Sequence, residues 1–114
     1  MDIERHDSGP VAVVAVRTPR LDGATAPQFK SYMVELMLNN VERIALDLSG
    51  VDFMDSIGLA SLMSSVKTMG GKGEIVLFGL NDKLRKLFAI TKLDRGVFRI
   101  FPGETEAMAA LEAV

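Results

Sequence analysis

Residues 44–59 read IALDLSGVDFMDSIGL and join three kinds of segment. The apolar run at residues 44–48 is typical of a buried strand, and residues 49–55 predict a loop. Apolar side chains then recur at helical spacing and predict a helix that ends at Gly70-Gly71. They are Leu59, Leu62, Met63 and Val66. A strand that passes through a loop into a helix is the repeating unit of an α/β domain.

The same alternation continues on both sides of this stretch. Further strands are predicted at residues 2–7, 11–16, 74–78 and 97–100. Further helices are predicted after Thr25, after Asn81 and after Pro102-Gly103, and Thr25 with Gln28 indicates a capping box. The order β-β-α-β-α-β-α-β-α predicts one α/β domain over residues 1–114. We expect a mixed, mostly parallel sheet of four to five strands with four helices.

Composition and charge argue against several classes of function. The chain has 114 residues, a formal net charge of −2 and no cysteine, so a disulfide or thiol chemistry is excluded. The sequence has no basic patch of the kind that would indicate nucleic-acid binding. No apolar run approaches the roughly 20 residues of a membrane span, and the charged N-terminus does not resemble a signal peptide. We expect a cytoplasmic protein that is monomeric alone, without cofactor or metal.

Ser56 is the most interesting candidate for chemistry. It lies at or next to the N-cap of the helix that follows Asp55. Its plain structural role would be to accept a hydrogen bond from a backbone N–H of the first turn. The functional interpretation is that Ser56 is exposed and open to modification. A phosphate there would meet the positive end of the helix dipole and add about −1.5 to −2 charges to the surface.

Catalysis by the chain itself is not indicated. Ser56 lacks a G-x-S-x-G elbow, and the lone His6 lies in a charged segment. Asp47, Asp52 and Asp55 match no calcium loop. The glycines of residues 70–73 follow a helix rather than a strand, which is the wrong order for a phosphate-binding loop. We therefore expect no catalytic residue, and we expect Met54 to form an adaptable partner contact in a loop.

Residues 44–59 closely resemble the signature of STAS domains, specifically the bacterial anti-anti-sigma factors (anti-sigma factor antagonists). The resemblance extends upstream to Arg20-Leu21-Asp22 and downstream to residues 77–80 and 84–93. It covers roughly residues 11–112. Two positions depart from the family pattern: Ile57 stands where Ser or Thr is frequent, and Arg20 where Gly is frequent.

The resemblance implies a phosphorylation switch. In the family, the serine directly after the aspartate, here Ser56, is phosphorylated by a serine kinase that doubles as an anti-sigma factor. The unmodified protein binds that kinase and releases the sigma factor, the phosphorylated protein lets go, and a phosphatase acting on phospho-Ser56 resets it. Asp22 matches an aspartate of the kinase-binding surface, and we expect it to be exposed. The expected partner-binding residues are Asp22, Met54, Asp55, Ser56, Ile57 and Gly58.

Two alternatives remain open. The chain could be an unmodified STAS subunit of a transporter or sensory complex. It could also be a small nucleotide-binding protein, although the missing phosphate-binding loop and catalytic base argue against this class.

Overall fold

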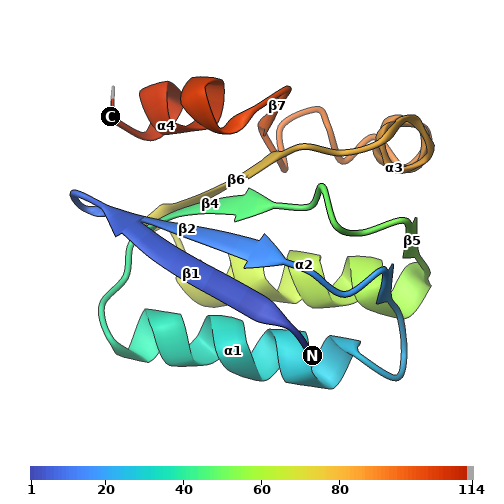
Figure 1. Cartoon of the computed structure of the whole chain (residues 1–114), viewed down its shortest axis with the longest axis horizontal. Helices are drawn as coiled ribbons and strands as arrows, with labels where there is room; N and C mark the ends of the chain where they lie inside the picture. The colour runs from blue at the N-terminus through green and yellow to red at the C-terminus, as the bar shows by residue number, and fades with distance from the viewer. Residues whose placement is uncertain (113–114) are drawn as a thin grey trace.

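A central sheet lies between two layers of helices in the computed structural model of the chain (Figure 1). The structure describes residues 1–112, so the last two residues of the predicted domain lie outside the described part. The elements are β1 (Ile3–Ser8), β2 (Val11–Val16), β3 (Arg20–Leu21), α1 (Ala26–Leu38), β4 (Arg43–Asp47), β5 (Phe53–Met54), α2 (Ser56–Met69), β6 (Glu74–Phe78), α3 (Asp82–Ile90), β7 (Ile100–Phe101) and α4 (Glu104–Glu112).

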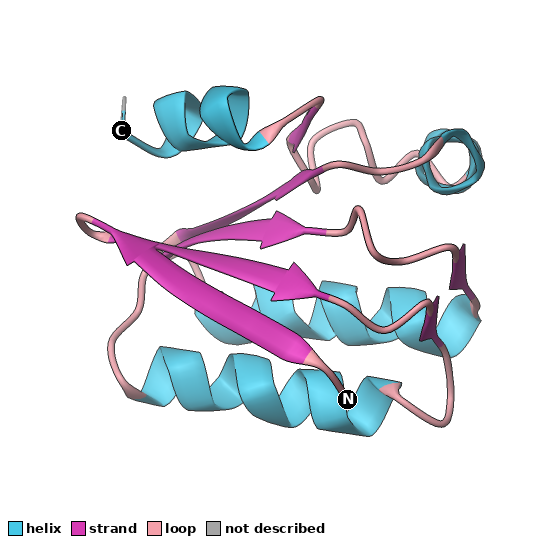
Figure 2. Cartoon of the chain, in the orientation of Figure 1, coloured by secondary structure: helices cyan, strands magenta, loops and turns pink. Residues whose placement is uncertain are grey.

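The main sheet has the order β1-β2-β4-β6-β7. Only the β1–β2 hairpin within it is antiparallel, and the other neighbours pair in parallel. In the register of the central strands, Ala45 lies between Val13 and Val76. The carboxyl ends of β2, β4 and β6 therefore point to one edge, where β3, β5 and α3 also lie (Figure 2). The predicted α/β class, the mixed sheet and the four helices are confirmed.

Alternate side chains of the central strands serve the two faces of the sheet. One face carries Val14, Leu46 and Leu77, which join Phe29 of α1 and Leu62 of α2 in a large apolar cluster. The opposite face forms a smaller cluster under α4. Its members are Val11, Val13, Ala45, Val76, Phe78, Ala107 and Leu111. Burial on both faces explains why β2 reads as a continuous apolar run.

Several local predictions were wrong. The last strand begins at Ile100 and not at residue 97, while Phe98 is buried ahead of it in the connecting segment. Thr25 makes no side-chain cap of α1, because its hydroxyl donates to the Arg20 carbonyl oxygen at 2.8 Å instead. Met63 is 41% exposed rather than part of the core. Gly70 does end α2, in the left-handed conformation that glycine favours.

Candidate functional site

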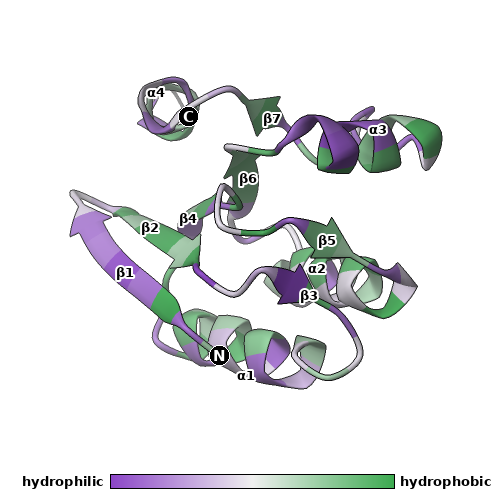
Figure 3. Cartoon of the chain, turned by 45° about the vertical axis from the view of Figure 1, so that its right-hand side comes forward, coloured by the Kyte–Doolittle hydropathy of each residue, from purple (hydrophilic) through white to green (hydrophobic). Residues whose placement is uncertain are grey.

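A second, two-stranded sheet builds the edge of the molecule where the candidate site lies. Arg20 pairs with Phe53 and Leu21 with Met54, in parallel. The Pro19 carbonyl oxygen accepts from the backbone N–H of Asp52 and of Phe53, at 2.7 and 3.1 Å. In Figure 3, β3 and β5 lie side by side, next to the start of α2. This pairing places residues 20–22 beside residues 53–56, although the sequence predicts residues 49–55 as a loop.

Asp55, and not Ser56, is the N-cap of α2. Its extended backbone directs the carboxylate at the first turn, where Oδ1 accepts from Ile57 N at 3.0 Å and from Gly58 N at 2.9 Å. Ser56 is the first helical residue and is exposed. The expected capping role of Ser56 is therefore wrong, and its hydroxyl is not required to hold the helix start. The expectation that Ser56 is exposed at the first turn is confirmed.

Gly58 and Met54 lie beneath the surface. A Cβ at Gly58 would collide with the Leu21 carbonyl oxygen, so only glycine lets α2 approach β3 this closely. Met54 is 5% exposed and belongs to the main apolar cluster. The expectation that Met54 lies in a loop as an accessible partner contact is therefore wrong, because β5 turns its side chain inward. Both residues are therefore buried and support the exposed residues of the site.

Ile57 is an exposed neighbour of Ser56 in the site, whereas Asp22 is partly buried. Ile57 is 55% exposed, and its Cδ1 lies against Gly23, 3.2 Å from where a Cβ of that glycine would be. An apolar side chain this exposed at a helix start is available to a partner surface. Asp22 was expected to be exposed, but its side chain is only 20% exposed because the turn before α1 folds around it.

The Asp22 carboxylate organises that turn. Its Oδ1 accepts from Ala24 N at 3.0 Å, and its Oδ2 accepts from Arg20 Nε at 3.3 Å. Desolvation alone would raise the pKa of Asp22. The hydrogen bonds from the Ala24 backbone, the Arg20 side chain and the Thr25 backbone, together with the Arg20 charge, outweigh it and leave that pKa below its ordinary value. Asp22 is thus held as a carboxylate beside the start of α2.

Arg20 completes the cluster. Its guanidinium carbon lies 4.2 Å from the centroid of the Phe53 ring, a cation–π distance. The same side chain pairs with Asp22 and is 61% exposed. In the sequence, Arg20 belongs to the stretch that resembles the family but departs from the family pattern, and the pattern predicts no role for it. The pairing of β3 with β5 brings Arg20 to the site. Strands of two residues are too short to be recognised from a sequence pattern.

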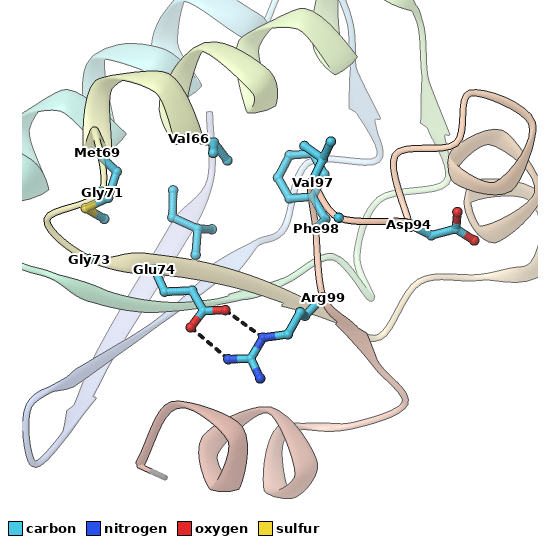
Figure 4. Close-up of a pocket in the computed structure, with 11 residues that line it drawn as sticks. Val66, Met69, Gly71, Gly73, Glu74, Asp94, Val97, Phe98 and Arg99 are labelled. Atoms are coloured by element: carbon cyan, nitrogen blue, oxygen red, sulfur yellow. Dashed lines mark hydrogen bonds and ion pairs between the residues drawn. The ribbon is translucent and has the colours of Figure 1, made fainter. Parts of the chain in front are cut away.

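A surface hollow of about 540 Å³ lies at the other end of α2. Val66, Met69 and the segment that carries Val97 line it, and an ion pair of Glu74 with Arg99 borders it (Figure 4). That pair is bidentate, at 2.6 and 2.7 Å, so the two charges neutralise each other. The hollow lies at the Met69 end of α2, about 20 Å along the helix from Ser56. It is therefore separate from the candidate site.

Within residues 1–112, no helix combines the length and the apolar character that crossing a membrane requires.

The chain belongs to the STAS domain family, whose sequence pattern matches residues 2–107. The anti-sigma-B factor antagonist of Listeria monocytogenes is 36% identical over 74 residues, which cover 64% of this chain and 65% of that relative. The match thus spans slightly less than two thirds of the relative.

Solved structures agree on the fold. An anti-sigma factor antagonist from Mycobacterium paratuberculosis superposes with a TM-score of 0.88 at 24% identity, covering 97% of this chain and 93% of that one. The Bacillus cell fate determinant SpoIIAA in its phosphorylated form superposes with a TM-score of 0.71 at 15% identity, covering 96% and 97%.

Proposed function

We propose that the chain is an anti-sigma factor antagonist controlled by phosphorylation of Ser56. Unmodified, it binds an anti-sigma factor that is also a serine kinase, and phosphorylated, it releases that partner. One observation carries this proposal: Ser56 is exposed at the first residue of α2 while Asp55 alone caps the helix. The Ser56 hydroxyl is therefore accessible, and it is not needed to cap the helix.

The chain supplies only the acceptor in this reaction. The kinase transfers the γ-phosphoryl group of ATP to Ser56 Oγ, so that a new O–P bond forms while the bond to the ADP oxygen breaks. The hydroxyl proton passes to a base of the kinase, and ADP leaves. A phosphatase restores the hydroxyl by hydrolysing the new bond with water. The chain itself is proposed to be a regulator and not an enzyme.

The fold tolerates the phosphate, whereas the partner surface does not. At the first turn of α2 the added charge meets backbone N–H groups and the positive end of the helix dipole, although Asp55 opposes it. At an interface the same group is bulky and strongly hydrated, and it must be desolvated before a partner can cover it. Phosphorylation therefore weakens binding without unfolding the domain.

The relatives support this proposal by their names. The Listeria protein is an anti-sigma-B factor antagonist, and the Bacillus protein SpoIIAA occurs in a phosphorylated form. The partner surface on this chain would comprise Asp22, Asp55, Ser56 and Ile57, with Gly58 and Met54 supporting it from beneath.

The direct experiment incubates the purified chain with γ-labelled ATP and an extract of the cells that express it, and maps the label by mass spectrometry. We expect label on Ser56, none on the Ser56→Ala variant, and full labelling of Ser31→Ala, whose serine is also exposed, on α1. The chain alone with ATP should take up no label. Equal labelling of Ser56→Ala would show that the acceptor is another residue.

A further inference from the structure

Arg20 is an exposed cation fixed at the start of α2. The Phe53 ring supports one face of its guanidinium at 4.2 Å, and Asp22 accepts from its Nε at 3.3 Å. Both contacts are made on the surface, since the side chain is 61% exposed. Such contacts hold the guanidinium near the site but leave its remaining N–H donors open to another acceptor.

The strand pairing places this guanidinium close to Ser56. Arg20 lies beside Phe53 in the parallel β3–β5 pair, and the Asp55 backbone N–H donates to the Leu21 carbonyl oxygen at 3.4 Å. Asp22 directly follows β3 and therefore lies beside Asp55, the residue before Ser56. The guanidinium lies over Phe53 and against Asp22, so its charge lies next to the segment that leads into α2.

A phosphate on Ser56 would enter an acidic environment. Asp22, Asp52 and Asp55 all lie in the two segments that β3 and β5 bring together. Their repulsion opposes a dianion, and a guanidinium within reach would offset it. A phosphate is also a better partner than a carboxylate for Arg, because it carries more charge and offers three oxygens to the planar fork of N–H donors.

We propose that Arg20 is the intramolecular counter-charge of phospho-Ser56, and that the phosphate draws the guanidinium away from Asp22. This inference rests on the proposed function, because it requires Ser56 to be the modified residue. The exchange breaks one ion pair and forms another, so it needs no change in the main sheet. Asp22 keeps its hydrogen bond from Ala24 N and stays in place, but it loses its cation.

Phosphorylation would then alter two parts of the partner surface at once. Ser56 gains a hydrated dianion, and the Arg20–Asp22 pair that a partner meets on the unmodified chain is opened. Arg20 acts here as a positioning residue for the phosphate, since the kinase and not this chain performs the transfer.

The test needs no kinase. Phosphoserine is incorporated at position 56 during translation of the full chain, and the phosphate is titrated by ³¹P NMR in the wild-type chain and in three variants. We expect Arg20→Gln to raise the second pKa of the phosphate by roughly half a unit, and Arg20→Lys to raise it less, because an exposed cation lowers that pKa modestly. Arg5→Gln is the matched control, because Arg5 pairs with Asp7 at the same two-residue spacing on β1. It should leave the titration unchanged.

A second readout follows Asp22 itself. The ¹³C signal of its carboxyl should titrate at a higher pH in the phosphorylated chain than in the unmodified one, and this rise should be larger in the wild type than in Arg20→Gln. The phosphate charge raises the Asp22 pKa in both proteins, but only the wild type also loses a guanidinium, so equal rises would contradict the exchange. Identical phosphate titrations of wild type and Arg20→Gln would overturn the counter-charge. An unchanged Asp22 titration would overturn the exchange. Neither result touches the proposed function, which is decided separately by labelling of Ser56 in cell extract.

Discussion

The side chains of Asp55 and Ser56 have different tasks although they are neighbours. The carboxylate of Asp55 satisfies two backbone N–H groups of the first turn, which leaves the Ser56 hydroxyl free. The sequence pattern could identify the helix start but could not assign the cap, because Asp and Ser are both strong N-cap residues. The assignment depends on the extended backbone of Asp55, whose N–H donates to the Leu21 carbonyl oxygen at 3.4 Å.

Substitutions at these two positions should therefore differ in their effect on stability. We expect Ser56→Ala to change the free energy of unfolding by less than about 0.5 kcal/mol, as for other exposed sites. Asp55→Ala should cost about 1 kcal/mol, because it leaves two N–H groups of the first turn unsatisfied. Urea denaturation followed by circular dichroism measures both values. A larger loss for Ser56→Ala than for Asp55→Ala would contradict the assignment of the cap.

Asp22 should make stability depend on pH. Its folded-state pKa is depressed, so its contribution is present above the unfolded-state pKa of about 3.9 and is lost as pH falls through the folded-state value. We expect Asp22→Asn to be less stable than wild type at pH 7. The difference in free energy of unfolding between the two proteins should become smaller below pH 4. Urea denaturation at pH 7 and pH 3 compares the two proteins, and a gap that stays equal at both would count against this role.

At the scale of elements, the sequence pattern predicts the long strands and the helices but not the short strands. The strand β2 is a continuous apolar run, and β4 and β6 have apolar residues buried on both faces between or after charged ends, so the pattern of all three is strong. The strands β3 and β5 have two residues each, which is too short for any periodicity. For this reason the sequence pattern predicts a loop at Met54 and does not connect Arg20 with Ser56.

The contact between α2 and β3 gives an element-scale prediction. In an exposed helix, Gly→Ala would raise stability by about 1 kcal/mol. At Gly58 the added methyl group would meet the Leu21 carbonyl oxygen, so we expect Gly58→Ala to lower the free energy of unfolding by about 1–3 kcal/mol. Thermal and urea denaturation measure the change. A gain in stability would show that α2 does not approach β3 this closely.

At the scale of the whole molecule, helices cover both faces of the sheet and the site lies at one edge of it. The helices α1 and α2 pack on one face and α4 on the other, while the start of α2, whose first residue is Ser56, lies at the edge where the central strands end (Figure 1). Charge added at that edge does not enter either apolar cluster. The fold class and this placement followed from the strand–helix alternation, as is general for open α/β sheets.

Irregular segments also contribute to the core, which can be tested at Phe98. Its buried ring meets Phe88 of α3 edge to face at a centroid distance of 5.7 Å. We expect Phe98→Ala to cost about 3–5 kcal/mol, because it removes a large buried side chain. The adjacent Val97 is 43% exposed, and Val97→Ala should change stability by less than about 0.5 kcal/mol. Urea denaturation of both variants would contradict this packing if their losses were equal.

We propose that phosphate on Ser56 releases a partner without refolding the domain. The most direct measurement is calorimetric titration of the chain, unmodified and with phosphoserine at position 56, against the kinase that labels it, with backbone NMR spectra of both forms. We expect affinity to fall at least about tenfold, equivalent to about 1.4 kcal/mol. NMR shift changes should be confined to residues 20–24 and 52–60. Equal affinity of the two forms would contradict the switch, and shift changes throughout the central strands would contradict a local mechanism.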